Sequence, residues 1–305
     1  MSIFEDIRDS FRQPNNTLKQ LILINVIVFV VLIVLRTVLY LSENSGMYNL
    51  LMRYLALNSE PAYFFTRPWT LITYFFTHEG FLHILFNMLN LYWFGQLVRE
   101  YLGDKKLLSL YVLGGIAGGI LYLLCYNFIP YFADRASFSL MIGASASVLA
   151  IVVGAATLLP DFSFNLILIG PVKIKYIAAF LLLLSISGAV GDNAGGNLAH
   201  LGGALIGWVF IRQLQRGNDL GRPVLAVTGF FSRLFSRRPK LKVTHRQAAY
   251  SSRTNGSGRT ASANYPGKPD QDEIDRILDK ISSSGYESLS KEEKQKLFQA
   301  SQKDS

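Results

Sequence analysis

Cysteine and charged residues are scarce in this chain of 305 residues. Cys125 is the only cysteine and lies inside an apolar run, which excludes an internal disulfide and a thiolate metal cluster. Charged residues make up 17% of the chain against 50% hydrophobic residues, and the mean hydropathy is +0.27. This composition excludes an ordinary soluble domain. The few charges also cluster between apolar runs, so we interpret the chain as a polytopic membrane protein.

The polar N-terminal segment 1–17, which we expect to be cytoplasmic, does not resemble a signal peptide, and the apolar run after it lacks a small-residue cleavage site. The next apolar run is too long for a signal peptide, and we expect an uncleaved first membrane span. Five charge-free stretches of about bilayer-crossing length follow it. The six predicted spans are 18–41, 81–98, 107–133, 136–160, 176–191 and 193–211. All six should be helical because unpaired backbone groups cannot face lipid, which gives an all-α fold class.

Between the first two spans, residues 42–77 are rich in aromatic side chains but are interrupted by charges and prolines. The interrupting residues are Arg53, Glu60, Pro61, Arg67 and Pro68. Aromatic residues with scattered charges suit the headgroup layer of a membrane. We therefore predict a long loop that is half-embedded in the membrane surface.

Lysine and arginine are distributed unevenly between the two sides of the predicted spans. The side that holds the N-terminus receives Arg8, Arg12, Lys19, Arg99, Lys105, Lys106, Lys173, Lys175 and the basic tail. The opposite side receives Arg53, Arg67 and Arg135. Because positive charge favours the cytoplasmic side, we predict that both termini are cytoplasmic.

Polar side chains lie near the outer ends of three predicted spans. His83 and Asn87 are in the second span, Ser145 is in the fourth and His200 is in the sixth. At ~1.5 Å rise per residue, Ser145 and His200 each lie roughly 7 Å below the outer boundary, and His83 and Asn87 share one helix face. Polar groups inside spans are costly and tend to mark function. A transporter would instead carry charged or broken helices at the midplane.

Small residues accompany these polar groups. One stripe of the sixth span consists of residues at spacings of four, three and four: Gly196, His200, Gly203 and Gly207. Such a stripe lets a neighbouring backbone come close to His200. The fourth span offers small residues in return: Gly143, Ala144, Ala146 and Gly154. We interpret the glycines of the third span, including Gly118, as packing residues only.

Three short motifs on the second, fourth and sixth spans resemble those of the rhomboid intramembrane serine proteases. The motifs are His83-Ile-Leu-Phe-Asn87, Gly-Ala-Ser145 and Ala199-His200-Leu-Gly-Gly203. The resemblance covers residues 18–213, and the long first loop is a family feature as well. It implies a six-transmembrane-helix rhomboid-like bundle in a bacterial inner membrane, with the active site opening to the periplasmic side and a cytoplasmic C-terminal tail.

The resemblance also implies a serine endopeptidase that cleaves transmembrane segments of single-span membrane proteins. Ser145 would be the nucleophile and His200 its general base, a dyad without a carboxylate. Asn87, His83 and Gly143 would hold the oxyanion and position the substrate, together with the Ser145 N–H at the helix start. No metal and no cofactor is expected.

Several alternatives remain open in the sequence. The family pattern is usually Gly-x-Ser-Gly, and Ala146 replaces its last glycine, adding one methyl group. A catalytically inactive rhomboid-like protein that binds transmembrane segments would typically lack the serine or the histidine, and this chain keeps both. Asn87 alone would also suit a hydrogen bond between helices. We assign His78 to the outer rim as a positioning group. By analogy, the long loop and the fifth span, with Ser185, Ser187 and Gly188 near its outer end, are candidates for a lateral gate.

A basic segment and then a Ser/Gly-rich segment follow the sixth span. Residues 212–246 contain nine lysine or arginine residues and one acidic residue, Asp219. Next to a bilayer such a segment anchors the topology and attracts anionic headgroups, whereas nucleic acid is not an expected partner. We predict a linker over 214–268, of which 247–268 is flexible.

The last segment, 269–305, regains a helical pattern. An apolar face at helical spacing is formed by Ile274, Ile277, Leu278 and Ile281. Gly285 interrupts it, and Ser290 with Glu293 forms a capping box that opens a second helix. We predict a small cytoplasmic helical hairpin. Two such short helices are marginally stable alone, so the hairpin docks on a partner or on itself, or the end is solvated and half-folded.

Overall fold

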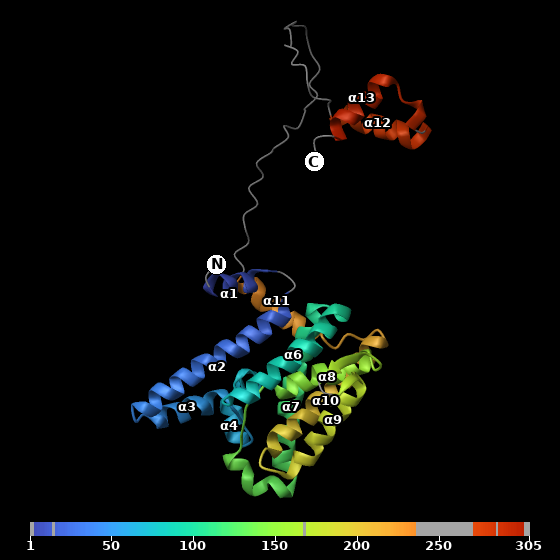
Figure 1. The fold of residues 1–305 in the computed structure, drawn as a ribbon. Helices are drawn as coiled ribbons and strands as arrows, with labels where there is room; N and C mark the ends of the chain where they lie inside the picture. Colours follow the sequence, from blue (N-terminus) through green and yellow to red (C-terminus); the bar gives the residue numbers. More distant parts are fainter. Residues whose placement is uncertain (1–2, 14–15, 167–168, 236–270, 285, 302–305) are drawn as a thin grey trace. The chain divides into compact units, whose positions relative to one another are not determined.

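The computed structural model describes residues 3–13, 16–166, 169–235, 271–284 and 286–301 (Figure 1). The chain divides into two compact units, Met1–Pro239 and Lys240–Ser305. Both are helical, and the strands of the described residues form two short antiparallel pairs. These are β1 (Leu57–Asn58) with β2 (Leu140–Met141), and β3 (Ser163–Leu166) with β4 (Gly170–Lys173).

Every predicted span contains a helix, as the coloured ribbon of Figure 1 shows. The six helices are α2 (Thr17–Leu41), α6 (Phe81–Leu102), α7 (Asp104–Phe128), α8 (Ser145–Leu158), α9 (Ile174–Ser187) and α10 (Ala194–Gln215). Within the described residues, α2, α6, α7 and α10 are long and apolar enough to cross a membrane, whereas α8 and α9 are shorter apolar helices. The predicted all-α polytopic membrane fold is confirmed.

The helix of the fourth span begins at Ser145 rather than at the predicted residue 136. Before it, the chain passes through η2 (Pro130–Phe138) and then β2, which pairs with β1. Gly143 has φ +119°, a conformation that other residues rarely adopt, so a helix cannot run through it. The predicted start was wrong because an apolar run does not distinguish a buried strand from a helix. Ser145 is consequently the first residue of α8.

The segment between α2 and α6, which the structure describes in full, contains no helix long and apolar enough to cross a membrane, as predicted, but it forms short helices rather than an irregular loop. It contains α3 (Ser45–Leu55), α4 (Pro61–Thr66), α5 (Thr70–Thr73) and η1 (Tyr74–Phe76). Tyr48, Tyr74 and Phe75 are almost completely buried. The Tyr74 hydroxyl donates to the carbonyl of Gly115 on α7 at 2.6 Å, and the Tyr111 hydroxyl of α7 donates to the carbonyl of Phe75 at 3.0 Å. Packing on α7 therefore stabilises helices that the local sequence does not reveal.

The backbones of α8 and α10 lie in contact along two glycines of α10. A Cβ on Gly203 would overlap the carbonyl oxygen of Ala146, and a Cβ on Gly207 would overlap that of Ala150. Small residues permit this approach between membrane helices. The close approach of a neighbouring backbone to this stripe is confirmed at Gly203 and Gly207.

The methyl group of Ala146 is accommodated by α7 on the other side of α8. A Cβ on Gly118 of α7 would lie only 2.5 Å from the Cβ of Ala146, which is 1% exposed. Ala146 therefore fills space that Gly118 leaves open. The departure from Gly-x-Ser-Gly is matched by a glycine on the neighbouring helix, which confirms the packing role predicted for Gly118.

Polar contacts tie several helix ends together at one end of the bundle. The N–H of Thr17 at the start of α2 donates to Asp104 at the start of α7 at 2.6 Å, and Lys106 forms an ion pair with Asp219 just beyond α10. The chain then forms α11 (Arg222–Phe235), a helix within the predicted linker 214–268 that the sequence analysis missed. A further unpredicted helix, α1 (Ile3–Arg12), lies in the polar N-terminal segment. Residues 236–268 of the predicted linker lie outside the described residues.

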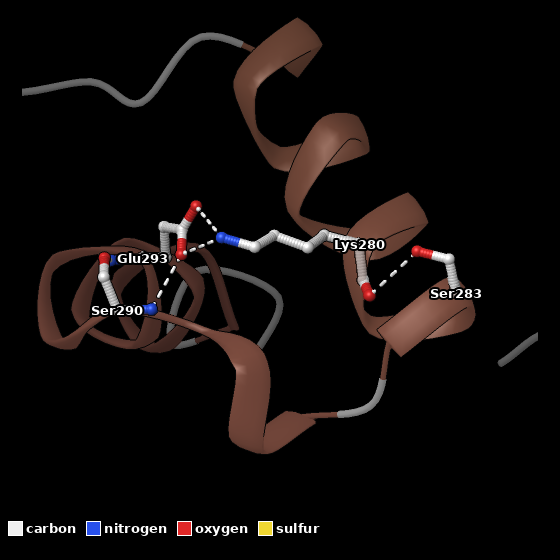
Figure 2. Close-up of polar contacts among 4 residues, drawn as sticks. All are labelled: Lys280, Ser283, Ser290 and Glu293. Carbon is white, nitrogen blue, oxygen red and sulfur yellow. Dashed lines mark hydrogen bonds and ion pairs between the residues drawn. The ribbon is translucent and has the colours of Figure 1, made fainter.

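The second unit contains the predicted pair of helices, α12 (Gln271–Ser284) and α13 (Lys291–Ser301), with η4 (Tyr286–Ser288) between them. Lys280 of α12 lies 3.0 Å from the carboxylate of Glu293 on α13 (Figure 2). The N–H of Ser290 donates to Glu293 and the N–H of Glu293 donates to the Ser290 hydroxyl, which confirms the predicted capping box. The Ser290 N–H and then Lys280 lower the pKa of Glu293. Gly285 lies outside the described residues, and docking of the hairpin stays a prediction.

The packing of α10 on α8 predicts that Gly203→Ala destabilises the bundle by about 1–3 kcal/mol, because the added methyl group forces the two backbones apart. Denaturant or thermal unfolding in detergent measures the change. Gly229→Ala in α11 is the matched control, since no neighbouring atom lies within 4 Å of a Cβ there. Its effect should stay below about 1 kcal/mol. Equal stability of the Gly203→Ala variant and the native chain would contradict the contact.

Candidate active site

A cavity of about 380 Å³ lies among α6, α8, α9 and α10. Its polar lining includes His83, Asn87, Ser145, Ser185, Asn197 and His200. Leu149, Val152 and Leu181 contribute to its apolar wall. The structure thus brings the serine, the asparagine and both histidines of the three sequence motifs to one cavity, although they lie far apart in the chain.

Ser145 is half-buried at the N-terminus of α8. The two residues before it are held by hydrogen bonds to the segment that follows α5. Gly143 N–H donates to the carbonyl of Tyr74 at 2.9 Å, and Ala144 N–H donates to Nε2 of His78 at 3.2 Å. As the first helical residue, Ser145 has no intrahelical carbonyl to accept its own N–H. The helix start therefore presents the Ser145 hydroxyl and backbone donors together.

His78 is completely buried, so its assignment to the outer rim was wrong. Besides accepting from Ala144 N–H, its Nε2 lies 3.2 Å from Nδ2 of Asn87. Because a backbone N–H can only donate, Nε2 must be an acceptor, which places the ring proton on Nδ1 and makes Asn87 the donor. His78 therefore joins the turn before Ser145 to α6. Nothing in its spacing from the other motifs could have indicated these hydrogen-bond partners.

Asn87 is 6% exposed and donates one of its two amide hydrogens to His78. The second hydrogen of the same NH2 group remains for another acceptor. Because Asn87 lines the cavity, this second hydrogen is available to a group bound there. The alternative of a bond between two membrane helices is not what the structure has, because His78 precedes α6 in a turn.

Gly143 and His83 lie against each other at the mouth of this site. A Cβ on Gly143 would come within 2.6 Å of Cε1 of His83. Two features favour glycine at position 143: its positive φ, and the imidazole of His83, which leaves no space for a side chain. The exposed ring of His83 in turn packs edge-on against the buried ring of His78, with the centroids 5.2 Å apart.

His200 is half-buried on α10, one turn before the contact of Gly203 with α8. Its Nδ1 lies 3.0 Å from the hydroxyl oxygen of Ser185 on α9. We expected Ser185 at a lateral gate, and its contact with His200 was not predicted. No direct hydrogen bond joins the described side chains of Ser145 and His200. Such bonds are often long before substrate binds.

No three metal-binding side chains of the His, Cys, Asp or Glu type come together within the residues that the structure describes. The side chains that line the cavity supply hydroxyls, imidazoles and amides, and backbone N–H groups lie at the start of α8. These are the parts of nucleophilic and general acid–base catalysis.

A family model described as the Rhomboid domain matches residues 66–216, which contain all the cavity-lining motifs. The chain belongs to the rhomboid family. A second model, described as a family of unknown function (DUF6576), matches residues 264–303 and thus the helical hairpin. The recognition made from the three motifs is confirmed.

Curated relatives of this rhomboid differ in what their names state. RHOMBOID-like protein 12, mitochondrial, from Arabidopsis thaliana is 29% identical over 159 residues, which is 48% of this chain and 47% of that protein. Rhomboid protease GlpG from Haemophilus influenzae is 27% identical over 201 residues, 62% of this chain and 93% of GlpG. Inactive RHOMBOID-like protein 8 from Arabidopsis thaliana is 30% identical over 82 residues, 27% of this chain and 23% of that protein. The chain spans about half or less of the mitochondrial and inactive relatives, and the family includes members named as inactive.

The bonds of His78 predict that His78→Phe destabilises the fold by about 1–3 kcal/mol, because Ala144 N–H and the Asn87 amide lose a buried acceptor. The phenyl ring keeps the size of the imidazole, so packing changes little. His83→Phe is the control, since His83 packs beside the same site but no hydrogen bond to its ring is found within the described residues. This variant should therefore cost less stability than His78→Phe. Unfolding in detergent compares the two variants. A larger loss for His83→Phe than for His78→Phe would refute the assigned bonds.

Proposed function

We propose that this rhomboid is an intramembrane serine endopeptidase that cleaves transmembrane segments of single-span membrane proteins with Ser145 and His200. The observation that carries the proposal is the shared cavity, which Ser145 lines from the start of α8 and His200 lines from α10. The contact of Gly203 with Ala146 fixes the separation of the two helices one turn from His200 and one residue from Ser145.

The proposed reaction uses groups that already lie in this cavity. His200 takes the hydroxyl proton of Ser145 as its oxygen attacks the scissile carbonyl carbon, forming a C–O bond and a tetrahedral oxyanion. The imidazolium then gives the proton to the leaving nitrogen as the C–N bond breaks. His200 then takes a proton from a water molecule as the water oxygen attacks the ester carbon. It gives this proton to the Ser145 oxygen as the ester C–O bond breaks, which releases the carboxylic acid and restores the hydroxyl.

The oxyanion would be held by the second amide hydrogen of Asn87, by His83 and by the Ser145 N–H, with Gly143 shaping the turn beneath them. Donors that already point at the developing charge are usually the largest catalytic contribution, and each is worth about 2.7–4 kcal/mol. The partial positive charge at the N-terminus of α8 adds to this field. The hydrogen bond to His78 supports this role of Asn87 as an oxyanion donor, because it identifies the nitrogen end of the amide.

A second, more apolar cavity supports a transmembrane segment as substrate. It has a volume of about 490 Å³ and is lined by Trp93 and Phe94 of α6, by residues of the β3–β4 hairpin and by Ile177 of α9. Asn90 lines both cavities, so the second cavity adjoins the first along α6. A cavity lined mainly by apolar side chains suits an apolar peptide better than a polar one.

We place the protein in a bacterial inner membrane with cytoplasmic termini and a site that opens to the periplasmic side. The support is the excess of lysine and arginine on the side of both termini. Asp161 follows α8 on that side and lies 2.9 Å from Lys173 and 2.8 Å from Lys175. These two lysines lower the pKa of Asp161 to about 2.

The second candidate is a rhomboid-like protein that binds transmembrane segments without cutting them. The inactive relative gives this candidate its weight. Both Ser145 and His200 are present and line one cavity, which favours the protease.

Reconstituted protein should cleave a transmembrane substrate, and Ser145→Ala and His200→Ala should each lower the rate by roughly 10³-fold or more, because either loss removes the nucleophilic pair. Ser147→Ala is the matched control, since Ser147 is two residues further on α8, does not line the cavity, and should leave most of the activity. A fluorophosphonate probe should label the native chain and not Ser145→Ala. Equal cleavage by all four proteins, or substrate binding without cleavage by the native chain, would reject the protease.

A further inference from the structure

We infer that Ser185 is a positioning residue that holds His200 in the tautomer required of a base for Ser145. The inference rests on the proposed function. Ser185 is 3% exposed, lies on α9 and places its hydroxyl oxygen 3.0 Å from Nδ1 of His200. No carboxylate takes this position among the residues that line the cavity.

The direction of the hydrogen bond follows from a second contact of the same hydroxyl. Ser185 Oγ lies 2.9 Å from the carbonyl oxygen of Leu181, one turn earlier on α9. A hydroxyl has one hydrogen, and a carbonyl oxygen can only accept. If that hydrogen pointed at Nδ1, two oxygen lone pairs would face each other at 2.9 Å. The hydroxyl therefore donates to Leu181 and accepts from Nδ1–H of His200.

A proton on Nδ1 leaves Nε2 of the neutral ring with its lone pair. Nε2 is then the nitrogen that takes the proton of Ser145. When it does so, the ring becomes a cation, and the bond from Nδ1–H to Ser185 becomes a charge-assisted one, which is roughly twice as strong as a neutral bond. Ser185 thus does with a neutral oxygen what the carboxylate of a serine protease triad does with a charged one.

The corner between α9 and α10 fixes the separation of Ser185 and His200. Asn197, one turn before His200, donates from Nδ2 to the carbonyl of Gly188 at 2.9 Å. Gly188 follows Ser185 closely at the end of α9, and a Cβ there would overlap the Asn197 side chain. The hydrogen-bonded pair Ser185 and His200 therefore lies next to a close contact between α9 and α10.

The direct test is the ¹⁵N spectrum of the histidine rings in the full chain, labelled at its four histidines and assigned for His200 with the His200→Ala variant. The native chain should show Nδ1 of His200 protonated and Nε2 unprotonated. Ser185→Ala should raise the fraction with the proton on Nε2. Ser185→Thr retains a hydroxyl and should restore the native pattern. Ser187→Ala is the control because Ser187 is exposed two residues further along α9.

Activity gives a second readout. Ser185→Ala should lower kcat roughly 10-fold with KM changed less than about threefold, as expected for the loss of one hydrogen bond to the base. A native spectrum with the proton on Nε2 overturns the inference without any variant. So does a Ser185→Ala protein with native kcat and native spectrum. If the native chain does not cleave at all, the proposed function fails, while the spectrum still decides the hydrogen bond.

A separate observation concerns α11, and from it we propose that this helix lies on an anionic bilayer surface. Four apolar side chains of α11 are more than half exposed: Val227, Phe230, Phe231 and Leu234. They follow the spacing of one helix face, i, i+3, i+4 and i+7. Val224 of the same helix is buried, and Ala226 and Thr228 flank the stripe. Val224 lies three residues before Val227, so this face is buried at the start of α11 and exposed from Val227 to Leu234.

The chain keeps α11 close to the membrane. α10 ends at Gln215 and α11 begins at Arg222, so the link of six residues spans at most about 20 Å. Asp219 in this link pairs with Lys106 of α7 and accepts the N–H of Gly221 at 2.9 Å. The bond to Lys106 lowers the pKa of Asp219, which keeps the ion pair charged at neutral pH.

Basic residues next to the stripe favour an anionic partner. Arg222 is exposed at the start of α11, and the sequence of the same unit adds Arg233, Arg237 and Arg238. Asp219, the one acidic residue of the segment, is already paired. An apolar aromatic face with a basic flank matches the interfacial layer of an anionic leaflet. The apolar side chains would enter the acyl boundary and the basic ones would meet phosphates.

A nitroxide label reports the depth of α11 in the full chain. With Cys125→Ala as background, Phe230→Cys carries the label on the stripe and Asn218→Cys carries it on the exposed link. In nanodiscs of phosphatidylcholine with phosphatidylglycerol, the label at 230 should be severalfold more accessible to oxygen relative to a water-soluble nickel chelate than the label at 218. Removal of phosphatidylglycerol should reduce this difference. Equal chelate access at both positions in both lipids, or protection at 230 only with an added soluble protein, would overturn the proposal.

Discussion

Direct contact between the backbones of α8 and α10 is the constraint on which the rest of the site depends. Two helices in lipid gain little from burying apolar surface, so close packing must come from shape, and Gly203 and Gly207 supply it. The contact leaves no room for adjustment, because Ala146 is enclosed by Gly118 on the other side. Ser145 begins the central helix at this point, and His200 is carried on the helix that touches it.

A second layer of contacts sets the turn before Ser145. Tyr74 and His78 accept the N–H groups of Gly143 and Ala144, and Tyr74 is itself bonded to α7. These two hydrogen bonds pair the backbone N–H groups of the turn, although the turn belongs to neither a helix nor a sheet. The same imidazole orients Asn87, so one buried side chain sets both the backbone at the serine and the amide that faces it.

The sequence predicted the helices of all six spans and the residues that share the cavity, because long apolar runs and polar residues inside them are strong signals. It failed where tertiary contacts decide the backbone. The start of α8 depends on the positive φ of Gly143 and on the pairing of β2, and the helices of residues 45–76 depend on aromatic burial against α7. The hydrogen-bond partners of His78 and Ser185 could not be predicted either, since these partners lie on other elements and no local spacing relates them.

Ser185 belongs to α9, which also forms one wall of the cavity. Its hydrogen bond to His200 therefore spans the gap that would widen if α9 moved outward to admit a bulky peptide. Such an excursion would release the imidazole from its tautomer, and the return of α9 would restore it. Under the proposed function, an outward position of α9 would admit a substrate and its inward position would restore the hydrogen bond to the base, so that membrane proteins in brief contact with the open bundle would not be cleaved.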